Sequence, residues 1–483
     1  MKGHKDNNLL RFTSVMFEKS VYIERRAALR DTFTRKYGKG LLLFLGNEDS
    51  PINYPKNTYK FRQDSSFLYY FGLDRFGLAG IIDLEGGKDT IYGDDFSMDD
   101  IIWRGPQPRL ADMAHCVGIE TVRTINEFKS VLHQAIEQGR PIHFLPPYRG
   151  EQKLLLSNLL GIMPQALPSY VSPALIEAVI AQRSVKEPCE IQELDKISAV
   201  GYQMQIHAMQ HAVPGMRERL LAGELEAIAQ SYGYMTSFAT ILSQNGQTLH
   251  NEDHSQVLEK GRLLLVDCGA ESELHYASDH TRTTPVGGVF SQQQLDIYNI
   301  VLRAHDLGIE MSKPGVPYRD VHTAACRVIT EGLQALGIMK GNIDDSLEHG
   351  AHALFMPHGL GHMMGLDTHD MEGFNEDLVG YDSEIKRSTQ FGTGSLRFAR
   401  RLQKGFVVTV EPGIYFIPAL IDKWKNDGIN TAFINFDKLE PYRTFGGIRL
   451  EDDILITETG SRLIGAQQIP IKPEDVCNTV MKF

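Results

Sequence analysis

Apolar runs that end in an acidic residue recur in the second part of this chain. Leu263–Val266 leads into Asp267, and Val407–Val410 leads into Glu411 just before a Pro-Gly turn. Short apolar runs bounded by turn residues are typical of buried strands. Asp279 follows Asp267 by twelve residues, and a strand–turn–strand unit would bring both carboxylates to one face of a sheet. A solvated turn would explain either aspartate alone.

A fourth acidic position lies in a strand-like segment that follows a glycine pair, Gly446-Gly447. Arg449 and Glu451 are separated by one apolar residue, so at strand period they project from the same face. A solvated strand face would explain this spacing. It would not explain why acidic strand residues recur four times beside glycine-rich turns.

Three histidines, His358, His362 and His369, fall within twelve residues and are interleaved with glycines that permit close approach of the backbone. Histidine is the commonest imidazole donor to metals and the usual acid–base group near neutral pH. A single histidine here would be interpreted as structural. Three of them beside glycines favour a functional site.

These segments together supply two aspartates, two glutamates and at least one histidine. An oxygen-rich set with one imidazole suits divalent ions such as Mn²⁺ better than a structural zinc. Carboxylates can bridge two ions about 3.5–4 Å apart, and such a pair activates water for hydrolysis. The residues alone therefore predict metal-assisted hydrolysis.

The length of 483 residues predicts two domains, because single hydrophobic cores stop growing near about 250–300 residues. In the first third, apolar runs such as Leu41–Leu45 and Phe67–Phe71 are interpreted as strands between helix-compatible segments, which indicates an α/β domain. A polar, proline-punctuated stretch at Arg183–Pro188 marks the boundary. We expect one domain at residues 1–180 and a second at 181–483.

The second domain carries an internal repeat. A helical segment ends at Pro214-Gly215 and is followed by another helical segment, and the same order recurs at Pro314-Gly315, one hundred residues later. A helix–Pro-Gly–helix unit that occurs twice indicates two related halves.

Composition excludes several classes of function. The net charge of −12 disfavours nucleic acid as a partner, and no apolar run approaches the ~20 residues of a membrane span. The polar amino terminus lacks the continuous apolar region of a secretory signal. Five cysteines without a CxxC pair indicate reduced thiols. A cytoplasmic enzyme is expected.

The acidic and histidine segments, in this order, resemble those of the creatinase/methionine-aminopeptidase (pita-bread) metallopeptidases, closest to the proline-specific branch of prolidase and aminopeptidase P. Phe61–Gly72 resembles a signature of that branch's N-terminal domain, and Arg183–Pro188 resembles the start of its catalytic domain. The resemblance covers most of the chain. It implies an α/β (α+β) protein with a creatinase-like N-terminal domain and a pita-bread domain with a pseudo-two-fold internal duplication.

The resemblance also implies two divalent ions, Mn²⁺ first with Co²⁺ or Zn²⁺ as alternatives, and five protein ligands that hold them. These ligands are Asp267, Asp279, His362, Glu411 and Glu451, with Asp279 and Glu451 bridging. The two aspartates are twelve residues apart where the family commonly has eleven, so we expect an extra residue or a bulge between them. His280 stands where an aliphatic residue is usual and is interpreted as a packed strand histidine.

Further roles carry over from the family. His250 matches a histidine that contacts the substrate, and His358 and His369 match pocket histidines that orient the substrate and support the developing oxyanion. Glu411 is expected to shuttle a proton to the leaving proline nitrogen. Arg449 is expected to support the bridging carboxylate or the end of the substrate.

Arg397 distinguishes two versions of this activity. It falls where prolidases carry an arginine that captures the C-terminal carboxylate of a dipeptide, a task that suits the planar guanidinium. The alternative is a solvated arginine in a basic loop. The expected function is therefore cleavage of Xaa-Pro dipeptides, with an aminopeptidase P acting on longer peptides as the alternative.

Three other readings are less consistent with the sequence. A methionine aminopeptidase usually lacks the N-terminal domain, a creatinase-like hydrolase lacks the metal ligands, and a non-catalytic pita-bread binding protein would have lost them. The expected partners are small peptides with proline in second position and a second copy of this chain, as a homodimer or a tetramer.

Overall fold

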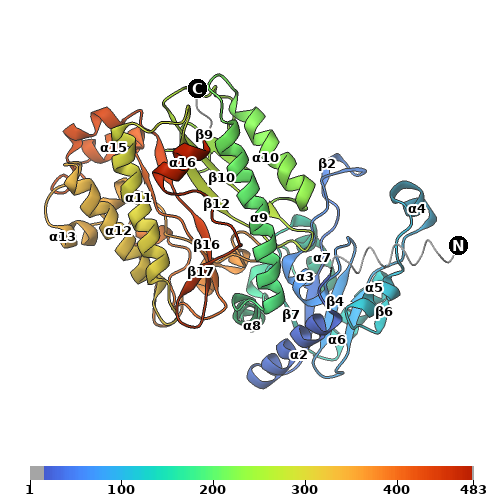
Figure 1. The fold of residues 1–483 in the computed structure, drawn as a ribbon. Helices are drawn as coiled ribbons and strands as arrows, with labels where there is room; N and C mark the ends of the chain where they lie inside the picture. Colours follow the sequence, from blue (N-terminus) through green and yellow to red (C-terminus); the bar gives the residue numbers. More distant parts are fainter. Residues whose placement is uncertain (1–15, 481–483) are drawn as a thin grey trace. The chain divides into compact units, whose positions relative to one another are not determined.

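The computed structural model describes residues 16–480, and the chain divides between Arg183 and Ser184 into two compact units (Figure 1). The boundary expected from the sequence lies three residues earlier. The first unit contains a five-stranded mixed sheet. Its strands, in spatial order, are β6 (Thr121–Arg123), β5 (Asp89–Tyr92), β4 (Ala79–Asp83), β1 (Leu41–Leu45) and β7 (Ile142–Phe144).

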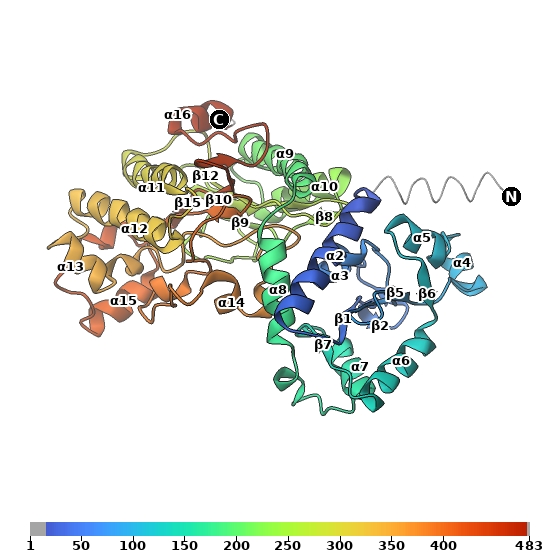
Figure 2. The same cartoon turned by 90° about the horizontal axis from the view of Figure 1, so that it is seen from below.

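Helices cover both faces of this sheet (Figure 2). Because side chains alternate along a strand, Leu41 and Leu43 of β1 pack with α6 and α7, while Phe44 contacts Phe71 of α3. The elements of this unit outside the sheet are α2 (Lys19–Lys36), β2 (Pro51–Tyr54), β3 (Asn57–Thr58), α3 (Ser65–Phe71), α4 (Met98–Arg104), α5 (Leu110–Cys116), α6 (Ile125–Glu137), α7 (Gly150–Leu160), η1 (Leu167–Ser169) and α8 (Pro173–Ser184).

The interpretation of Phe67–Phe71 as a strand was wrong, because these residues form the helix α3. Asp64 caps its start by accepting a hydrogen bond from the Phe67 amide, and Gly72 ends it in the left-handed conformation, with φ of 64°. Every residue of α3 is buried. A helix that is apolar all round shows no 3.6-residue periodicity, so its run of aromatic residues resembles a buried strand.

The second unit is built from two halves, each with a helix pair packed on antiparallel strands. The first half comprises α9 (Pro188–His211), α10 (Glu218–Tyr232), β8 (Met235–Thr236), β9 (Ile241–Ser243), β10 (Leu263–Cys268), β11 (Ala270–Glu271) and β12 (His280–Pro285). The second half begins with α11 (Gln292–Met311), α12 (Tyr318–Ala335), α13 (Ile343–Glu348), η2 (Ala351–Leu354), η3 (Glu372–Phe374), α14 (Glu376–Gly380) and η4 (Thr393–Ser395). It continues with β13 (Val407–Val410), β14 (Gly413–Tyr415), α15 (Pro418–Asn426), η5 (Phe436–Lys438), η6 (Glu440–Tyr442), β15 (Gly447–Arg449), β16 (Asp452–Ile456), β17 (Ser461–Leu463) and α16 (Pro473–Thr479).

The two halves repeat one backbone connection at the Pro-Gly turns. The amide of Gly215 donates to the carbonyl of Leu258 at 2.7 Å, and the amide of Gly315 donates to the carbonyl of Leu402 at 2.8 Å. Both glycines have positive φ, 89° and 87°, which a residue with a side chain rarely adopts. The internal duplication indicated by the sequence is thus present, and the mixed α/β class is confirmed.

Among residues 16–480, no helix has the length and apolar character needed to cross a membrane. All five cysteines are free thiols.

Candidate metal centre and active site

Two antiparallel strand pairs place the acidic residues. β10 pairs with β12 so that Asp267 lies opposite Thr281, and Asp279 immediately precedes β12. In the other half β13 pairs with β16, and Glu411 directly follows β13. Each half therefore delivers carboxylates from the ends of a buried strand pair.

A bridge between β12 and the segment before β16 joins the two sets. The amide of Glu451 donates to the carbonyl of Thr281 at 3.0 Å, and the Thr281 hydroxyl donates to the Glu451 carboxylate at 2.6 Å. This fixes Glu451 beside the aspartates of the first half, although 170 residues separate it from Thr281.

The five expected ligands lie in one group, in which Glu411 is partly exposed and the other four are buried. Carboxylate and imidazole atoms of Asp279, His362 and Glu451 are within 4.8 Å of one another. Nε2 of His362 lies 3.5 Å from Asp279 and 3.9 Å from Glu411. Asp267 joins the group through Arg449, whose guanidinium donates to it at 2.5 Å and lies 4.0 Å from Glu451.

His362 presents one ring nitrogen to this group. Its Nδ1 lies 3.0 Å from the carbonyl of Met363, and a carbonyl can only accept, so Nδ1 carries the proton. Nε2 is then left with a free lone pair that faces Asp279 and Glu411. The hydrogen bond from Nδ1 to the Met363 carbonyl is the kind of contact that orients metal-ligating histidines in proteins.

The carboxylates repel one another strongly. Burial, followed by the charges of neighbouring carboxylates, raises the pKa of Asp279 and of Glu451 well above the usual range. Burial also raises the pKa of Glu411. One oxygen each of Asp267 and Asp279 is buried without a hydrogen-bond partner among residues 16–480. Buried charged groups in proteins are paired or coordinate metals, and the oxygen-rich donor set here fits hard or borderline divalent ions.

His358 stands at the edge of this group and is tied to a residue that the sequence analysis did not single out. Its Nε2 lies 2.9 Å from the hydroxyl of Tyr415, and its Nδ1 lies 2.7 Å from the carbonyl of Gly359. Tyr415 also accepts a hydrogen bond from Arg449 at 3.0 Å. In the sequence, only the position of Tyr415 four residues after Glu411 could have indicated that it belongs to the site. Burial lowers the pKa of His358 to about 3, so the ring is neutral at physiological pH.

His369 and Arg397 share an acidic neighbour, Glu372. Nδ1 of His369 lies 3.5 Å from Glu372, and the His369 ring packs edge-on against His362 with centroids 4.3 Å apart. Arg397 donates to Glu372 at 2.6 Å and to Glu376 at 2.9 Å. Burial lowers the pKa of His369, and the charges of His362 and Arg397 lower it further. The role of Glu372 was not foreseen from the sequence.

The remaining candidates lie at the periphery. His250 is exposed on a turn, and its charge contributes to lowering the pKa of His358 and of His369. His280 is buried, with Nε2 3.1 Å from the Ser198 hydroxyl. The segment between Asp267 and Asp279 contains β11, which pairs with β8.

Residues 192–458 match the family model of metallopeptidase family M24, and residues 22–143 match that of the aminopeptidase P N-terminal domain. The chain belongs to metallopeptidase family M24. This confirms the expected family and its fold: an N-terminal aminopeptidase P domain followed by a pita-bread metallopeptidase domain.

Proteins similar to this M24 member carry two kinds of name. The chain is 30% identical to an Xaa-Pro dipeptidase of Rattus norvegicus over 86% of this chain and 84% of the relative. It is 31% identical to a probable Xaa-Pro aminopeptidase of Aspergillus fumigatus over 83% and 84%. Among solved structures, a Zn-substituted Escherichia coli aminopeptidase P in complex with product matches with a TM-score of 0.75 and 25% identity, over 96% of this chain and 98% of the other.

Proposed function

We propose that this chain hydrolyses the bond between an N-terminal residue and proline, by means of two divalent cations. The observation that carries the proposal is the convergence of Asp279, His362 and Glu451 within 4.8 Å, with Glu411 and Asp267 beside them. The relatives named for Xaa-Pro dipeptidase and Xaa-Pro aminopeptidase activity support the same substrate class.

Charge supports two cations rather than one. Five carboxylates face one guanidinium, that of Arg449, which leaves four negative charges in excess when all are ionised. They are the four proposed acidic ligands and the buried Asp453, which accepts a hydrogen bond from the Asp279 amide. One divalent ion would leave the group negative, whereas two would balance it and favour ionisation of a water molecule. When bound, such ions supply a nucleophile from water and polarise the scissile carbonyl. Mn²⁺ is the proposed ion because four of five donors are carboxylates.

Glu411 and the side chains around the metal ligands are proposed to transfer a proton and to bind the substrate. Glu411 is partly open to solvent, with its side chain 19% exposed, and is placed to pass a proton to the leaving proline nitrogen. His369 is neutral and 39% exposed, so its single N–H group can donate to the substrate carbonyl. His358 is held by Tyr415 and orients this wall of the pocket, and His250 contacts the substrate from the exposed turn. Arg449 donates to Asp267, which supports a role in holding this ligand.

Dipeptide cleavage is the preferred version of the activity. Arg397 is half-buried. Burial is the main cause of the pKa shifts of Glu411, His358 and His369, and the charge of Arg397 also contributes to them, which supports a position for Arg397 near the pocket. A guanidinium at this edge can grip the C-terminal carboxylate of a dipeptide. The same group is shared with Glu372 and Glu376, so a substrate carboxylate has to compete for it.

Hydrolysis of Ala-Pro beside Ala-Pro-Ala, by enzyme stripped of metal and then supplied with Mn²⁺, tests the function. Cleavage of the dipeptide alone would establish an Xaa-Pro dipeptidase. Efficient cleavage of the tripeptide would establish an aminopeptidase P and remove the substrate role of Arg397. Cleavage of neither, with Mn²⁺ bound, would refute the proline specificity.

We further propose that the chain forms a homodimer and that it resides in the cytoplasm. The helix α4 leaves Met98, Ile102 and Trp103 70%, 69% and 75% exposed, an apolar patch suited to a second copy of the chain. Five free thiols suit a reducing compartment. Light scattering that finds only monomer, or fractionation that finds the protein outside the cytoplasm, would contradict the respective part.

A further inference from the structure

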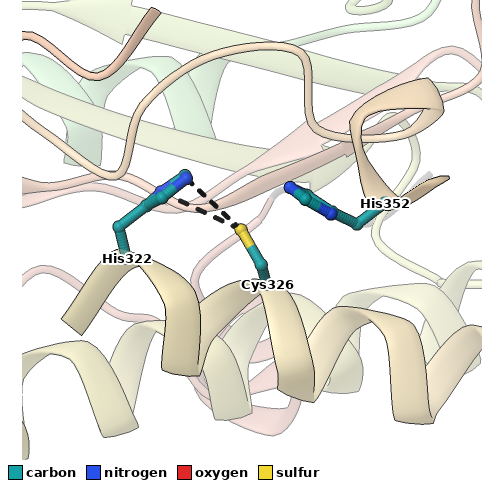
Figure 3. A group of neighbouring side chains, drawn as sticks. All are labelled: His322, Cys326 and His352. Carbon is teal, nitrogen blue, oxygen red and sulfur yellow. Dashed lines mark hydrogen bonds between the residues drawn. The ribbon is translucent and has the colours of Figure 1, made fainter. Parts of the chain in front are cut away.

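Three soft or borderline donors gather apart from the carboxylate group (Figure 3). His322 and Cys326 lie one helical turn apart on α12 and project from the same face, and His352 approaches from η2. Figure 3 shows the Cys326 sulfur between the two imidazole rings. None of the three belongs to the proposed hydrolytic site.

The spacing of their donor atoms is close to that around a metal ion. One ligand atom from each residue lies within 4.8 Å of the other two, and Sγ of Cys326 is 3.5 Å from Nε2 of His322. With metal–sulfur bonds of about 2.3 Å and metal–nitrogen bonds of about 2.0–2.1 Å, ligated sulfur and nitrogen lie about 3.6–3.8 Å apart. Closing the group on an ion would therefore require a shift on the order of 1 Å.

The three side chains are buried, and one of them lacks a hydrogen-bond partner. His322, Cys326 and His352 are 1%, 1% and 3% exposed. Nδ1 of His352 has no hydrogen-bond partner in the part of the chain that the structure describes. A thiol that donates to His322 would account for two members of the group as ordinary core residues. It leaves the position of the buried His352 ring unexplained, whereas an ion between the three side chains would give that ring a partner.

Among the described residues, the group of possible metal ligands at this place contains no carboxylate. Burial lowers the pKa of His322 to about 3 and that of His352 to about 4, and raises the pKa of Cys326 to about 12. No carboxylate contributes to any of these shifts. Within this group of described residues, only the Cys326 thiolate can offset the charge of an ion. Cu⁺ with one thiolate gives a neutral group, while Zn²⁺ would leave one buried positive charge.

We propose that His322, Cys326 and His352 form a site for one thiophilic cation, separate from the hydrolytic centre, and that the site takes Cu⁺ in preference to Zn²⁺. Soft thiolate and imidazole donors are those that Cu⁺ prefers. Binding releases the thiol proton to solvent as the sulfur–copper bond forms, with no change of oxidation state. The ion would fasten η2 to α12, six residues before His358.

The full-length protein is incubated with Cu⁺ under anaerobic reducing conditions, or with Zn²⁺, and then treated with EDTA to clear weakly held metal. Metal per chain and the X-ray absorption spectrum of the retained ion are measured. We expect one copper per chain with one sulfur and two nitrogen neighbours. Because the five proposed hydrolytic ligands contain no sulfur, this signature identifies the site in the unaltered protein.

Variants then assign the ligands. Cys326→Ser and His352→Gln should retain no stoichiometric copper, whereas Cys477→Ser and the exposed His349→Gln should retain it as the unaltered chain does. Activity with Mn²⁺ in Cys326→Ser reports that the variant has folded. Absence of sulfur-bound metal from the unaltered chain, or copper retained by Cys326→Ser, would overturn the site. Sulfur-bound zinc without copper would overturn the preference for Cu⁺.

Discussion

The hydroxyl of Tyr415 lies 2.9 Å from Nε2 of His358 and connects this pocket histidine to Arg449, which is 3.0 Å away on its other side. Since Nδ1 of His358 donates to a carbonyl, Nε2 is the acceptor and the tyrosine donates to it. Arg449 in turn holds Asp267 at 2.5 Å. One hydroxyl therefore links the orientation of a pocket histidine to that of a proposed metal ligand.

Replacement of this hydroxyl in Tyr415→Phe should lower kcat on Ala-Pro about tenfold and leave KM nearly unchanged. Arg449, which is buried, and His358, which is 18% exposed, each lose a partner, so the free energy of unfolding should fall by about 1–3 kcal/mol. Steady-state kinetics and thermal unfolding check both. Tyr298→Phe is the matched control, because its buried hydroxyl donates to the Ile471 carbonyl away from the site. Tyr298→Phe should lose stability but keep kcat. An unchanged kcat in Tyr415→Phe would contradict the proposed link between His358 and Arg449 through Tyr415.

The strands that carry the acidic residues could be predicted from the sequence because each is a local pattern, an apolar run followed by an acid and a glycine turn. Tyr415 and Glu372 could not. Their importance arises from contacts with His358 and Arg397 across the fold, and nothing in their own neighbourhood distinguishes them. The aromatic helix α3 was mistaken for a strand for a related reason, since burial on all sides removes the periodicity that identifies a helix.

A bridging carboxylate should determine how many cations the protein holds. Glu451→Gln is expected to reduce Mn²⁺ from two per chain to one or none and to lower kcat/KM at least about 100-fold. Elemental analysis after gel filtration and a Mn²⁺ titration of activity measure these effects. Glu458→Gln removes an exposed carboxylate that pairs only with Lys404 among the described residues, and should change neither. Two ions retained by Glu451→Gln would show that this residue does not bridge.

The buried His280 should make stability depend on pH. Burial lowers its pKa from 6.5 to about 4, so as the pH falls below about 6.5 the unfolded chain binds a proton that the folded chain does not. Stability is complete above pH 6.5 and is lost between there and about pH 4. At pH 5 the loss relative to pH 7 should be about 2 kcal/mol from this residue.

Denaturant unfolding of metal-free protein at pH 7 and pH 5 measures this dependence. His280→Gln can keep the contact with Ser198 and should show the smaller difference between the two pH values. The exposed His349→Gln is the control and should behave as the unaltered chain does. If the free energy of unfolding changes equally between pH 7 and pH 5 in all three proteins, His280 is not held neutral in the folded chain.

Arg397 should determine the preference for dipeptides. Arg397→Ala removes the proposed grip on the C-terminal carboxylate, and KM for Ala-Pro is expected to rise roughly 10–100-fold, since a hydrogen bond to a charged group contributes about 1.5–3 kcal/mol. Cleavage of Ala-Pro-Ala should change little. Arg401→Ala, which removes an exposed arginine paired with Glu384, should leave both substrates unaffected. An unaltered kcat/KM for Ala-Pro in Arg397→Ala would end this assignment.

In the unaltered protein, Glu372 should weaken the binding of the dipeptide's C-terminal carboxylate by Arg397. Its carboxylate contacts Arg397 at 2.6 Å, and its side chain is only 12% exposed, so an incoming carboxylate meets a guanidinium that is already paired. Glu372→Gln keeps the shape and removes the charge, and should lower KM for Ala-Pro roughly threefold to tenfold with kcat nearly constant. The double variant with Arg397→Ala tests whether the effect passes through the guanidinium: the gain should disappear when Arg397 is absent. If the gain persists in the double variant, Glu372 acts on His369, 3.5 Å away, instead of on Arg397.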